Sequence, residues 1–439
     1  MREPLVVAID MGYGHMRPAR VLGERAGTVV HAADSPELAG EDERRLWARI
    51  RTAYESATRW SSRGLSGAPF RLLVDHFTGI DPLHPHRDQS RPDFAVRRFA
   101  AKLRAGLGRR LAEVQRESGR PLVATHFAPA LAAEAHGCED VHCVVTDTDV
   151  HRIWAPLEPQ RTRICYLVPA QRTLRRLRAY GVPRANVEVT GYPLPHSLLG
   201  GEELSVLARN LAARLVRLDP RRSFREASAG ELRAFLGSLP EEEEGRPPHI
   251  TFAVGGAGAQ TALVARALPS LRSALAEDRM RLTLVAGVRP EVAARFERLV
   301  REHGLERRVE ILRADTLDEY FRRFDELLAR TDVLWTKPSE LTFFGALGLA
   351  LVLSPPVGVH EGYNRRWARE HGAALKQRDA RYAGQWLVEA LEDGLLAAAA
   401  WSGYLRLPKF GLYRILRAIE AGQGDARNTR RQSGNEKLA

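Results

Sequence analysis

Short apolar runs alternate along most of the chain with longer segments whose apolar residues recur at helical spacing. The runs that predict strands are Leu5–Asp10, Thr28–Ala32, Phe70–Val74, Leu122–Thr125, Val141–Thr146, Ile164–Val168 and Val187–Thr190, and later Ile250–Val254, Leu282–Ala286, Val309–Leu312, Val333–Thr336 and Ala350–Leu353. Buried strands that alternate with helices are typical of a parallel sheet with helices on both faces. The sequence therefore predicts an α/β protein with two doubly wound parallel sheets.

The alternation stops between the two sets of strands. Two helix-like pieces, Glu203–Arg217 and Ala229–Leu236, are followed there by the acidic and proline-rich stretch EEEEGRPP. After Asp379 the pattern is helical to about Ala421. We predict a first domain over 1–196, an inserted helical and acidic segment over 197–248, a second domain over 249–421 and a disordered tail over 422–439.

A glycine-rich loop between a strand and a helix occurs twice, at Leu5–Pro18 (LVVAIDMGYGHMRP) and at Ile250–Leu263 (ITFAVGGAGAQTAL). Glycine lets the backbone approach a ligand closely, and a helix start offers free N–H groups to an anion. Since each loop opens a series of strands and helices, the pair predicts two Rossmann-like domains that face each other across a cleft. Such an arrangement suits an enzyme that brings a phosphorylated donor to a second substrate.

The chain has 439 residues and a formal net charge of +12, and the excess is clustered. Arg91–Arg120 carries nine Lys or Arg against three Asp or Glu, and Arg172–Arg178 carries four arginines. Apolar residues at helical spacing predict one amphipathic helix with a basic outer face over most of Arg91–Arg120. That face is either a solvated surface or a site for anionic lipid headgroups. Nucleic acid is not an expected partner, since no recognition motif accompanies the charge.

The remaining composition favours a cytoplasmic protein. The N-terminus, MREPLVVAID, leads directly into a strand pattern with no signal peptide, and the most apolar stretch, Leu341–Leu353, is too short to span a bilayer. Cys138, Cys143 and Cys165 lack CxxC spacing, which indicates buried thiols in a reducing compartment and no zinc site.

Four motifs of the first half occur in a particular order. They are Gly12-Tyr13-Gly14-His15, Thr125-His126, the stretch VVTDTDVHRIW (Val144–Trp154) and NVEVTGYP (Asn186–Pro193). In this order they resemble the glycosyltransferases that include plant monogalactosyldiacylglycerol synthase, bacterial processive diacylglycerol glucosyltransferases and the peptidoglycan lipid-intermediate N-acetylglucosaminyltransferase. The second half is similar to this family too. VGGAGAQ resembles the GGSxGA loop, TKPSELT (Thr336–Thr342) the KPGG.T segment and GVHEGYN (Gly358–Asn364) the PGQE..N segment.

The resemblance implies the two-domain GT-B fold and an inverting transfer from a nucleotide-sugar, without a metal or other cofactor, to a lipid-linked or other hydrophobic acceptor at the cytoplasmic membrane face. The acceptor would bind the first domain, through Gly12, Gly14, His126 and His151. His15 would be the base for the acceptor hydroxyl, with Asp147 as the competing candidate. The donor, a UDP-sugar in much of this family, would bind the second domain through Gly255, Gly256, Gly258, Ala259, Gln260, Ser339, Leu341, Thr342, His360, Glu361 and Asn364.

Several of these residues have simpler explanations. His15 could only cap its loop, and His126 could be a packed, hydrogen-bonded histidine. Asp147-Thr148-Asp149 imitates the metal-binding DxD of another glycosyltransferase fold, and we interpret this as coincidence. His360, Glu361 and Asn364 could only form a helix N-terminus.

The chain departs from the family at the donor site. The glutamate expected three residues after Thr342, whose carboxylate holds the ribose hydroxyls in the family, is replaced by Gly345, and the paired glycines are replaced by Ser339 and Glu340. Three alternatives therefore stay open. The chain binds a nucleotide-sugar without the ribose contact, it uses a different donor, or it has lost activity. The alternatives to lipid glycosylation are a nucleotide-sugar epimerase, a transferase for a soluble acceptor and a catalytically silent sugar- or nucleotide-binding protein. With a ribonucleotide donor, we expect Gly345→Glu to tighten binding if the helix there tolerates the side chain.

Overall fold

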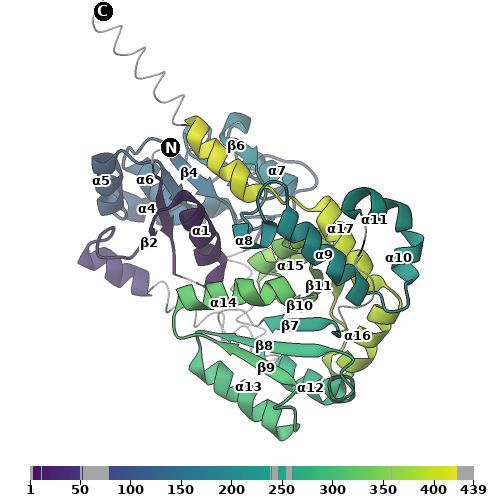
Figure 1. Ribbon diagram of the computed structural model, residues 1–439. Coiled ribbons are helices and arrows are strands. Elements are labelled where there is room, and N and C mark those ends of the chain that lie inside the picture. The colour runs from purple at the N-terminus through teal and green to yellow at the C-terminus, as the bar shows by residue number, and fades with distance from the viewer. Residues whose placement is uncertain are drawn as a thin grey trace, which may run out of the picture. The chain divides into compact units, whose positions relative to one another are not determined.

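The computed structural model describes residues 3–10, 12–49, 52, 79–237, 239, 246–253, 260–356 and 358–422 (Figure 1). The chain forms two compact units. The first comprises the chain up to Leu194 together with the segment from Phe410 onward, and the second is Pro195–Lys409.

The first unit is built on a six-stranded parallel sheet in the order β2-β1-β3-β4-β5-β6. Its strands are β1 (Leu5–Ala8), β2 (Val30–Ala32), β3 (Leu122–Ala124), β4 (Val141–Val144), β5 (Cys165–Val168) and β6 (Val187–Val189). Its helices are α1 (Tyr13–Ala26), α4 (Phe94–Arg104), α5 (Arg109–Ser118), α6 (Phe127–Ala135) and α7 (Gln171–Ala179), with the short turns η2 (Arg152–Trp154), η3 (Pro159–Arg161) and η4 (Arg184–Asn186) and helical residues at 41–49 and 411–422. β1, β3 and β4 are buried along their whole length, because every residue of these short strands faces packed helices or neighbouring strands.

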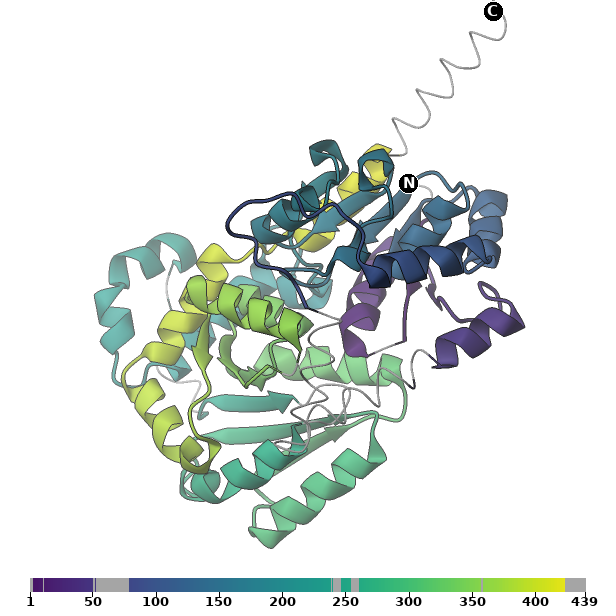
Figure 2. The same cartoon turned by 180° about the vertical axis from the view of Figure 1, so that it is seen from behind.

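The second unit has a six-stranded parallel sheet in the order β12-β11-β10-β7-β8-β9. Its strands are β7 (His249–Ala253), β8 (Arg281–Gly287), β9 (Val309–Arg313), β10 (Val333–Thr336), β11 (Ala350–Leu353) and β12 (Ala374–Lys376). Its helices are α8 (His196–Leu199), α9 (Ser205–Arg217), α10 (Ser223–Ala227), α11 (Ala229–Leu236), α12 (Thr261–Ala276), α13 (Pro290–Glu302), α14 (Leu317–Arg330), α15 (Val359–Glu370), α16 (Ala383–Glu392) and α17 (Leu395–Arg406), with 3-10 turns at η6 (Glu340–Leu347) and η7 (Ala380–Tyr382). Helices α12 and α13 lie on one face of this sheet and α14 on the other (Figures 1 and 2).

Both sheets confirm the predicted α/β class with two Rossmann-like folds. In the first sheet β2 is added on one side of β1, and β3 to β6 are added on the other side. In the second sheet β8 and β9 are added on one side of β7, and β10 to β12 on the other. The strand order therefore reverses between β1 and β3 and between β7 and β10. In open parallel sheets, ligands bind beyond the carboxyl ends of the strands at such a reversal point. The predicted strand Phe70–Val74 lies outside the described residues, and β12 is a strand that the sequence pattern did not predict.

The two units divide the chain differently from the predicted domains. Helices α8 to α11, expected in a separate insertion, belong to the second unit, where α9 packs on α17. Helix 411–422, expected in the second domain, belongs to the first unit. It packs closely there, since a Cβ on Gly411 would collide with the carbonyl group of Tyr192 and one on Gly422 would lie 3.3 Å from Asp140 Oδ1.

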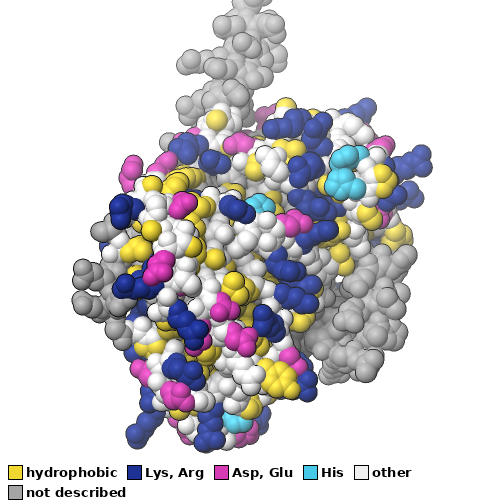
Figure 3. Space-filling view, turned by 90° about the vertical axis from the view of Figure 1, so that its right-hand side faces the viewer, with side chains coloured by type: hydrophobic (Ala, Val, Ile, Leu, Met, Phe, Trp, Pro, Cys, Tyr) yellow, Lys and Arg dark blue, Asp and Glu magenta, His cyan; other side chains and the backbone are white. Residues whose placement is uncertain are grey.

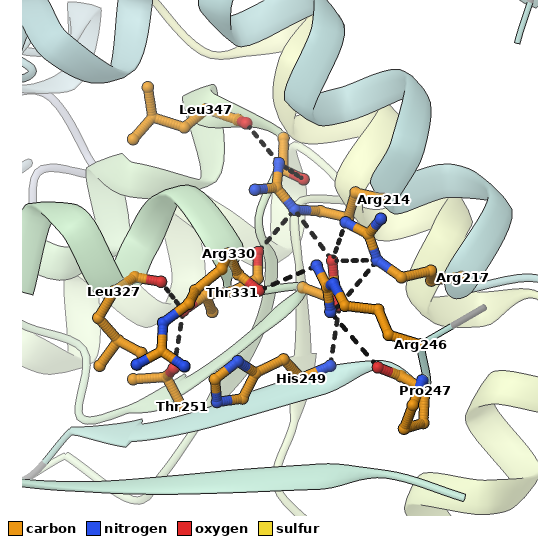
Figure 4. A network of polar contacts seen from close by, with 12 residues as sticks. Arg214, Arg217, Arg246, Pro247, His249, Thr251, Leu327, Arg330, Thr331 and Leu347 are labelled. Carbon is orange, nitrogen blue, oxygen red and sulfur yellow. Dashed lines mark hydrogen bonds and ion pairs between the residues drawn. The ribbon is translucent and has the colours of Figure 1, made fainter. Parts of the chain in front are cut away.

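A buried polar network ties α9 to the second sheet (Figure 4). Figure 4 shows the guanidinium groups of Arg214, Arg217 and Arg246 gathered at one point. Their common partner is Asp332, which precedes β10, has no exposed surface and lies 2.8 Å from Arg217 Nη2 and 2.9 Å from Arg246 Nη1. Arg214 donates to the carbonyl oxygens of Thr331, Leu347 and Gly348 at 2.9, 3.0 and 3.1 Å. These bonds give a physical reason why the segment after Pro195 folds with the second unit.

The basic segment is two helices, so the prediction of one helix over most of Arg91–Arg120 is wrong. Gly106 and Gly108 have φ values of 106° and 82°, and they end α4 before α5 begins. Gly108 also lies so close to Ala132 of α6 that a Cβ would collide with it. Lys and Arg side chains are spread over the face that Figure 3 presents, with Asp and Glu among them. No helix in the described part of the chain is long and apolar enough to cross a membrane.

Candidate functional site

His15 lies at the reversal point of the first sheet. It belongs to the first turn of α1, which follows β1 through Gly12 at a φ of 111°. Its Nδ1 lies 2.9 Å from the carbonyl oxygen of Thr125, the residue after β3, and 3.3 Å from Thr146 Oγ1 beyond β4. Because a carbonyl oxygen can only accept, Nδ1 carries the proton, and in the neutral ring Nε2 is then a proton acceptor. Thr125 Oγ1 in turn donates to the backbone carbonyl of His15 at 2.8 Å.

His126 is the N-cap of α6. Its Nδ1 accepts a hydrogen bond from the backbone N–H of Ala128 at 3.2 Å, and the side chain is buried. The ring meets His15 edge-on at a centroid distance of 4.7 Å and also contacts Phe127 and Trp154. Burial, with a smaller contribution from the charge of His15, lowers the pKa of His126 well below its ordinary value. The contacts of His126 agree with the packed, hydrogen-bonded histidine considered above, placed beside His15.

Asp149, the last residue of the Asp147-Thr148-Asp149 stretch, is held by two arginines. Its carboxylate is completely buried, with Oδ2 2.7 Å from Arg172 Nε and Oδ1 2.7 Å from Arg176 Nε. A metal would have to displace these two arginines, which agrees with the interpretation that the DxD pattern is a coincidence. Asp147 is half-buried beyond the end of β4, so it lies at the same sheet edge as His15. Among the described residues there is no group of three or more His, Cys, Asp or Glu placed to hold a metal ion.

The other predicted acceptor residues lie near the same edge. Gly12 is the N-cap of α1 and Gly14 is in its first turn. His151 caps η2, where its Nδ1 accepts from the N–H of Ile153 at 3.2 Å and its Nε2 lies 3.4 Å from Asp93 Oδ2. Burial lowers the pKa of His151, although the charge of Asp93 opposes the shift. His151 is therefore engaged with α4, which Asp93 begins.

The second unit assembles part of its predicted donor site at the reversal point of the second sheet. Gly255, Gly256, Gly258 and Ala259 lie outside the described residues. Gln260 precedes α12, while Ser339, Leu341 and Thr342 follow β10 in and beside η6. Thr342 Oγ1 is buried and has no hydrogen-bond partner among the described residues, and the same holds for Ser354 Oγ beyond β11 and Gln260 Oε1. Since buried polar atoms normally have a partner, these atoms mark where a polar ligand could bind.

An ion pair joins the two remaining motifs of this edge. Lys337 Nζ, after β10, lies 2.6 Å from Glu361 Oε1 in the first turn of α15, and Glu361 is almost wholly buried. Asn364 donates to the carbonyl oxygen of Pro338 at 3.2 Å. His360 folds back over Gly358, the N-cap of α15. His360 and Glu361 lie in the first turn of α15, where the simpler explanation places them. Glu361 and Asn364 also bind residues of the segment after β10.

Gly345 is buried in η6, among the side chains of Leu351, Leu407 and Ala373. A Cβ there would lie 3.1 Å from Leu351 Cδ1 and 3.1 Å from Leu407 Cδ1. A glutamate at 345 therefore requires both leucine side chains to shift, and tighter ribose binding by Gly345→Glu stays a prediction. Glu340, the other departure from the family, is buried at the start of η6.

Sequence reasoning missed the partners of the predicted residues. Thr146 and the carbonyl group of Thr125 orient His15, Arg172 and Arg176 hold Asp149, and Lys337 holds Glu361. Thr125, Thr146 and Lys337 lie within recognised motifs, whereas Arg172 and Arg176 belong to the basic cluster Arg172–Arg178. The arginines are 23 and 27 residues from Asp149 and the lysine is 24 residues from Glu361, so no local sequence signal identifies these pairs.

Comparison with known proteins supports the fold. No protein-family model and no curated protein sequence matches the chain. The structure of S. aureus MnaA with UDP aligns with a TM-score of 0.50 and 12% identity over 97% of both chains. Acinetobacter baumannii MurG aligns with a TM-score of 0.50 and 13% identity over 95% of this chain and 99% of its own. At this identity the likeness concerns the fold alone, and the chain has the fold of the GT-B glycosyltransferases: two Rossmann-like domains, each on a six-stranded parallel sheet.

Proposed function

We propose that the chain is a metal-independent, inverting glycosyltransferase that uses a nucleotide-sugar donor. The observation that carries the proposal is the orientation of His15. Its Nδ1–H is held by the carbonyl group of Thr125, so Nε2 is the basic atom at the reversal point of the first sheet.

In the proposed reaction, Nε2 of His15 takes the proton of an acceptor hydroxyl as that oxygen attacks the anomeric carbon. The bond from the anomeric carbon to the diphosphate oxygen breaks, and the nucleoside diphosphate leaves with the electron pair. A positioned general base of this kind typically contributes 10²–10⁴-fold to the rate. Asp147 stays the competing base, because it is half-buried at the same edge.

The donor would bind the second unit at the reversal point between β7 and β10. Thr342 supplies a buried hydroxyl there, Lys337 supplies a positive charge and α12 and α15 both begin there. Helix N-termini and cations stabilise the negative charge that develops on a departing diphosphate. The neighbour MnaA was solved with UDP, which supports a uridine diphosphate as the first ligand to test.

The acceptor would be a hydrophobic or lipid-linked hydroxyl compound. The ring of His126 links His15 to the apolar rings of Phe127 and Trp154, so the region beside the proposed base is largely aromatic. The exposed basic side of α4 could bring the enzyme to an anionic membrane at its cytoplasmic face. On this proposal the protein is cytoplasmic and peripheral to the inner membrane surface.

A screen of nucleotide-sugars against the purified chain tests the proposal. We expect one nucleotide-sugar to raise the melting temperature and to be hydrolysed slowly, with release of nucleoside diphosphate. Conversion of the bound sugar to an isomer, with no diphosphate released, would favour an epimerase. Binding without turnover, with a broad set of acceptors present, would favour a silent binding protein.

A further inference from the structure

A cavity of about 600 Å³ lies within the first unit, between α4, α6 and the segment from η2 to β5. Its volume is in the range of small-molecule binding sites. Its lining residues come from α4, from Arg109 at the start of α5, from the second half of α6 and the residue after it, and from the segment that runs from η2 to β5.

The body of the cavity is apolar. One wall is the inward face of α4, with Val96, Phe99 and Leu103, and the opposite wall includes Leu131 of α6 and Leu157. Phe99 also packs on Phe127 of α6 at a centroid distance of 5.5 Å. A pocket with these walls favours a hydrocarbon chain, because burial of apolar surface is worth about 25 cal/mol per Å².

The rim of the cavity is basic, with four arginines against two glutamates. Both glutamates are already engaged. Glu134 accepts from Thr162 Oγ1 at 2.8 Å and from the backbone N–H of Arg163 at 2.6 Å, and Glu158 pairs with Arg161 at 3.0 Å.

The positive charges of two rim arginines, Arg104 and Arg109, are not balanced by a nearby carboxylate of the described residues. Neither Arg104 nor Arg109 has a carboxylate within ion-pair distance in the described part of the chain, whereas the neighbouring Arg110 pairs with Glu113 at 3.2 Å. A pair of exposed guanidinium groups beside an apolar pocket is complementary to a phosphate group attached to a hydrocarbon chain.

The rim and the proposed base lie toward opposite ends of the strands of the first sheet. Arg104 ends α4, whereas Asp93, which begins α4, contacts His151 near the edge of the sheet that carries His15. Arg163 precedes β5, so it lies at the amino end of the parallel strands, and His15 lies beyond their carboxyl ends. The arginine rim therefore lies apart from the catalytic edge, whereas the apolar wall of the cavity reaches Phe127, which contacts His126.

We propose that this cavity binds an amphiphile with one hydrocarbon chain and a phosphate head, with the chain between α4 and α6 and the phosphate on Arg104 and Arg109. This inference goes beyond the proposed sugar transfer and does not rest on it.

The test is titration of the full-length protein with dodecyl phosphate, below the concentration at which it forms micelles, by isothermal calorimetry. We expect saturable binding of one molecule per chain that weakens as salt is added. Inorganic phosphate and the neutral dodecyl maltoside should each bind at least ten-fold more weakly, since each offers only one of the two interactions.

Two matched pairs of variants locate the site. The double variant Arg104→Gln/Arg109→Gln should lower the affinity for dodecyl phosphate about ten-fold or more, whereas Arg110→Gln should leave it unchanged. Ala100→Trp should fill the cavity and abolish binding, whereas Ala101→Trp, at an exposed position of the same helix, should not. If Ala100→Trp does not fold, the double arginine variant still tests the proposal. Both arginines are exposed, so their replacement should leave the fold intact.

Absence of saturable binding of dodecyl phosphate overturns the proposal. An affinity that is the same in the wild type, in the double arginine variant and in Ala100→Trp overturns it too. Equal affinity for dodecyl maltoside would overturn the phosphate part. None of these readouts uses a nucleotide-sugar, so failure here and failure of the proposed transferase activity are distinguished by the donor screen.

Discussion

Arg217 and Asp332 join a helix of the segment after Pro195 to the start of β10, with Arg217 Nη2 2.8 Å from Asp332 Oδ1. The carboxylate is fully buried and also accepts from Arg246 Nη1 and from the backbone N–H of His249. Since removal of one partner leaves the other charges buried without compensation, this single acid holds several elements of the second unit in place.

Replacing that acid should therefore be costly. We expect Asp332→Asn to lower the free energy of unfolding by about 3–5 kcal/mol, the usual range for a broken buried ion pair. Urea denaturation followed by circular dichroism measures the change. Asp315→Asn is the matched control, because Asp315 pairs with Arg313 at 2.9 Å on the surface and should cost less than about 1 kcal/mol. Equal, small losses in both variants would contradict the role given to Asp332.

The same network predicts a dependence of stability on pH. Burial would raise the pKa of Asp332, but the hydrogen bonds from Arg217 and the charges of Arg217, Arg246 and Arg214 outweigh burial and lower it. A lowered pKa stabilises the fold above the unfolded value of about 3.9, and this contribution is lost as pH falls below that value toward the folded pKa. We expect wild-type stability to fall below about pH 4, and Asp332→Asn to lose less stability over that interval. Parallel acid profiles of the two proteins would argue against the linkage.

His15 gives the sharpest test of the proposed reaction. His15→Asn keeps a side-chain donor that can reach the carbonyl group of Thr125 but has no basic nitrogen, so we expect turnover to fall about 10²–10⁴-fold with little change in donor affinity. Initial rates of diphosphate release and calorimetric titration of the donor separate the two effects. His31→Asn serves as the control, since His31 pairs with Glu37 on the surface. Full activity in His15→Asn together with inactivity in Asp147→Asn would assign the base to Asp147.

Lys337 should contribute to donor binding through its charge. We expect Lys337→Met to weaken nucleoside diphosphate binding about ten-fold or more, because a hydrogen bond to a charged group is worth about 1.5–3 kcal/mol. Lys376→Met, an exposed lysine of β12, is the control. The loss of the ion pair with Glu361 could by itself disturb the site, so Lys337→Met/Glu361→Gln should be measured too. Restored affinity in the double variant would show that Lys337 acts only by neutralising Glu361.

Much of the fold could be predicted from the chain because both sheets consist of buried strands with strong apolar runs. β1 and β7 fall within a residue or two of their predicted places, so the strand before each glycine-rich segment was correctly predicted. The break between α4 and α5 was missed, since the helical spacing of apolar residues continues across Gly106 and Gly108 and hides it.

The site could be predicted only in part, because spacing along the chain identifies motifs and not their partners. His15 and Thr125 are 110 residues apart and meet only because β1 and β3 are neighbours in the sheet. The assignment of helix 411–422 to the first unit depends on packing against Tyr192 and against Asp140 and His142 at the start of β4, which no local pattern encodes.

At Gly345 the family comparison and the local packing lead to different expectations. The position was expected to accept a glutamate that improves donor binding, but its Cβ would lie 3.1 Å from both Leu351 and Leu407. We expect Gly345→Ala to lower the free energy of unfolding by about 1–3 kcal/mol through overpacking, and Gly345→Glu to lower it further because a charge would be buried without a partner. Gly362→Ala is the matched control, since a Cβ there meets nothing within 4 Å and alanine in place of glycine favours the α15 helix by about 1 kcal/mol. Thermal and urea unfolding of the three variants measure the difference. A stable Gly345→Glu protein with tighter binding of a uridine-diphosphate sugar would reverse this conclusion and return the ribose contact to position 345.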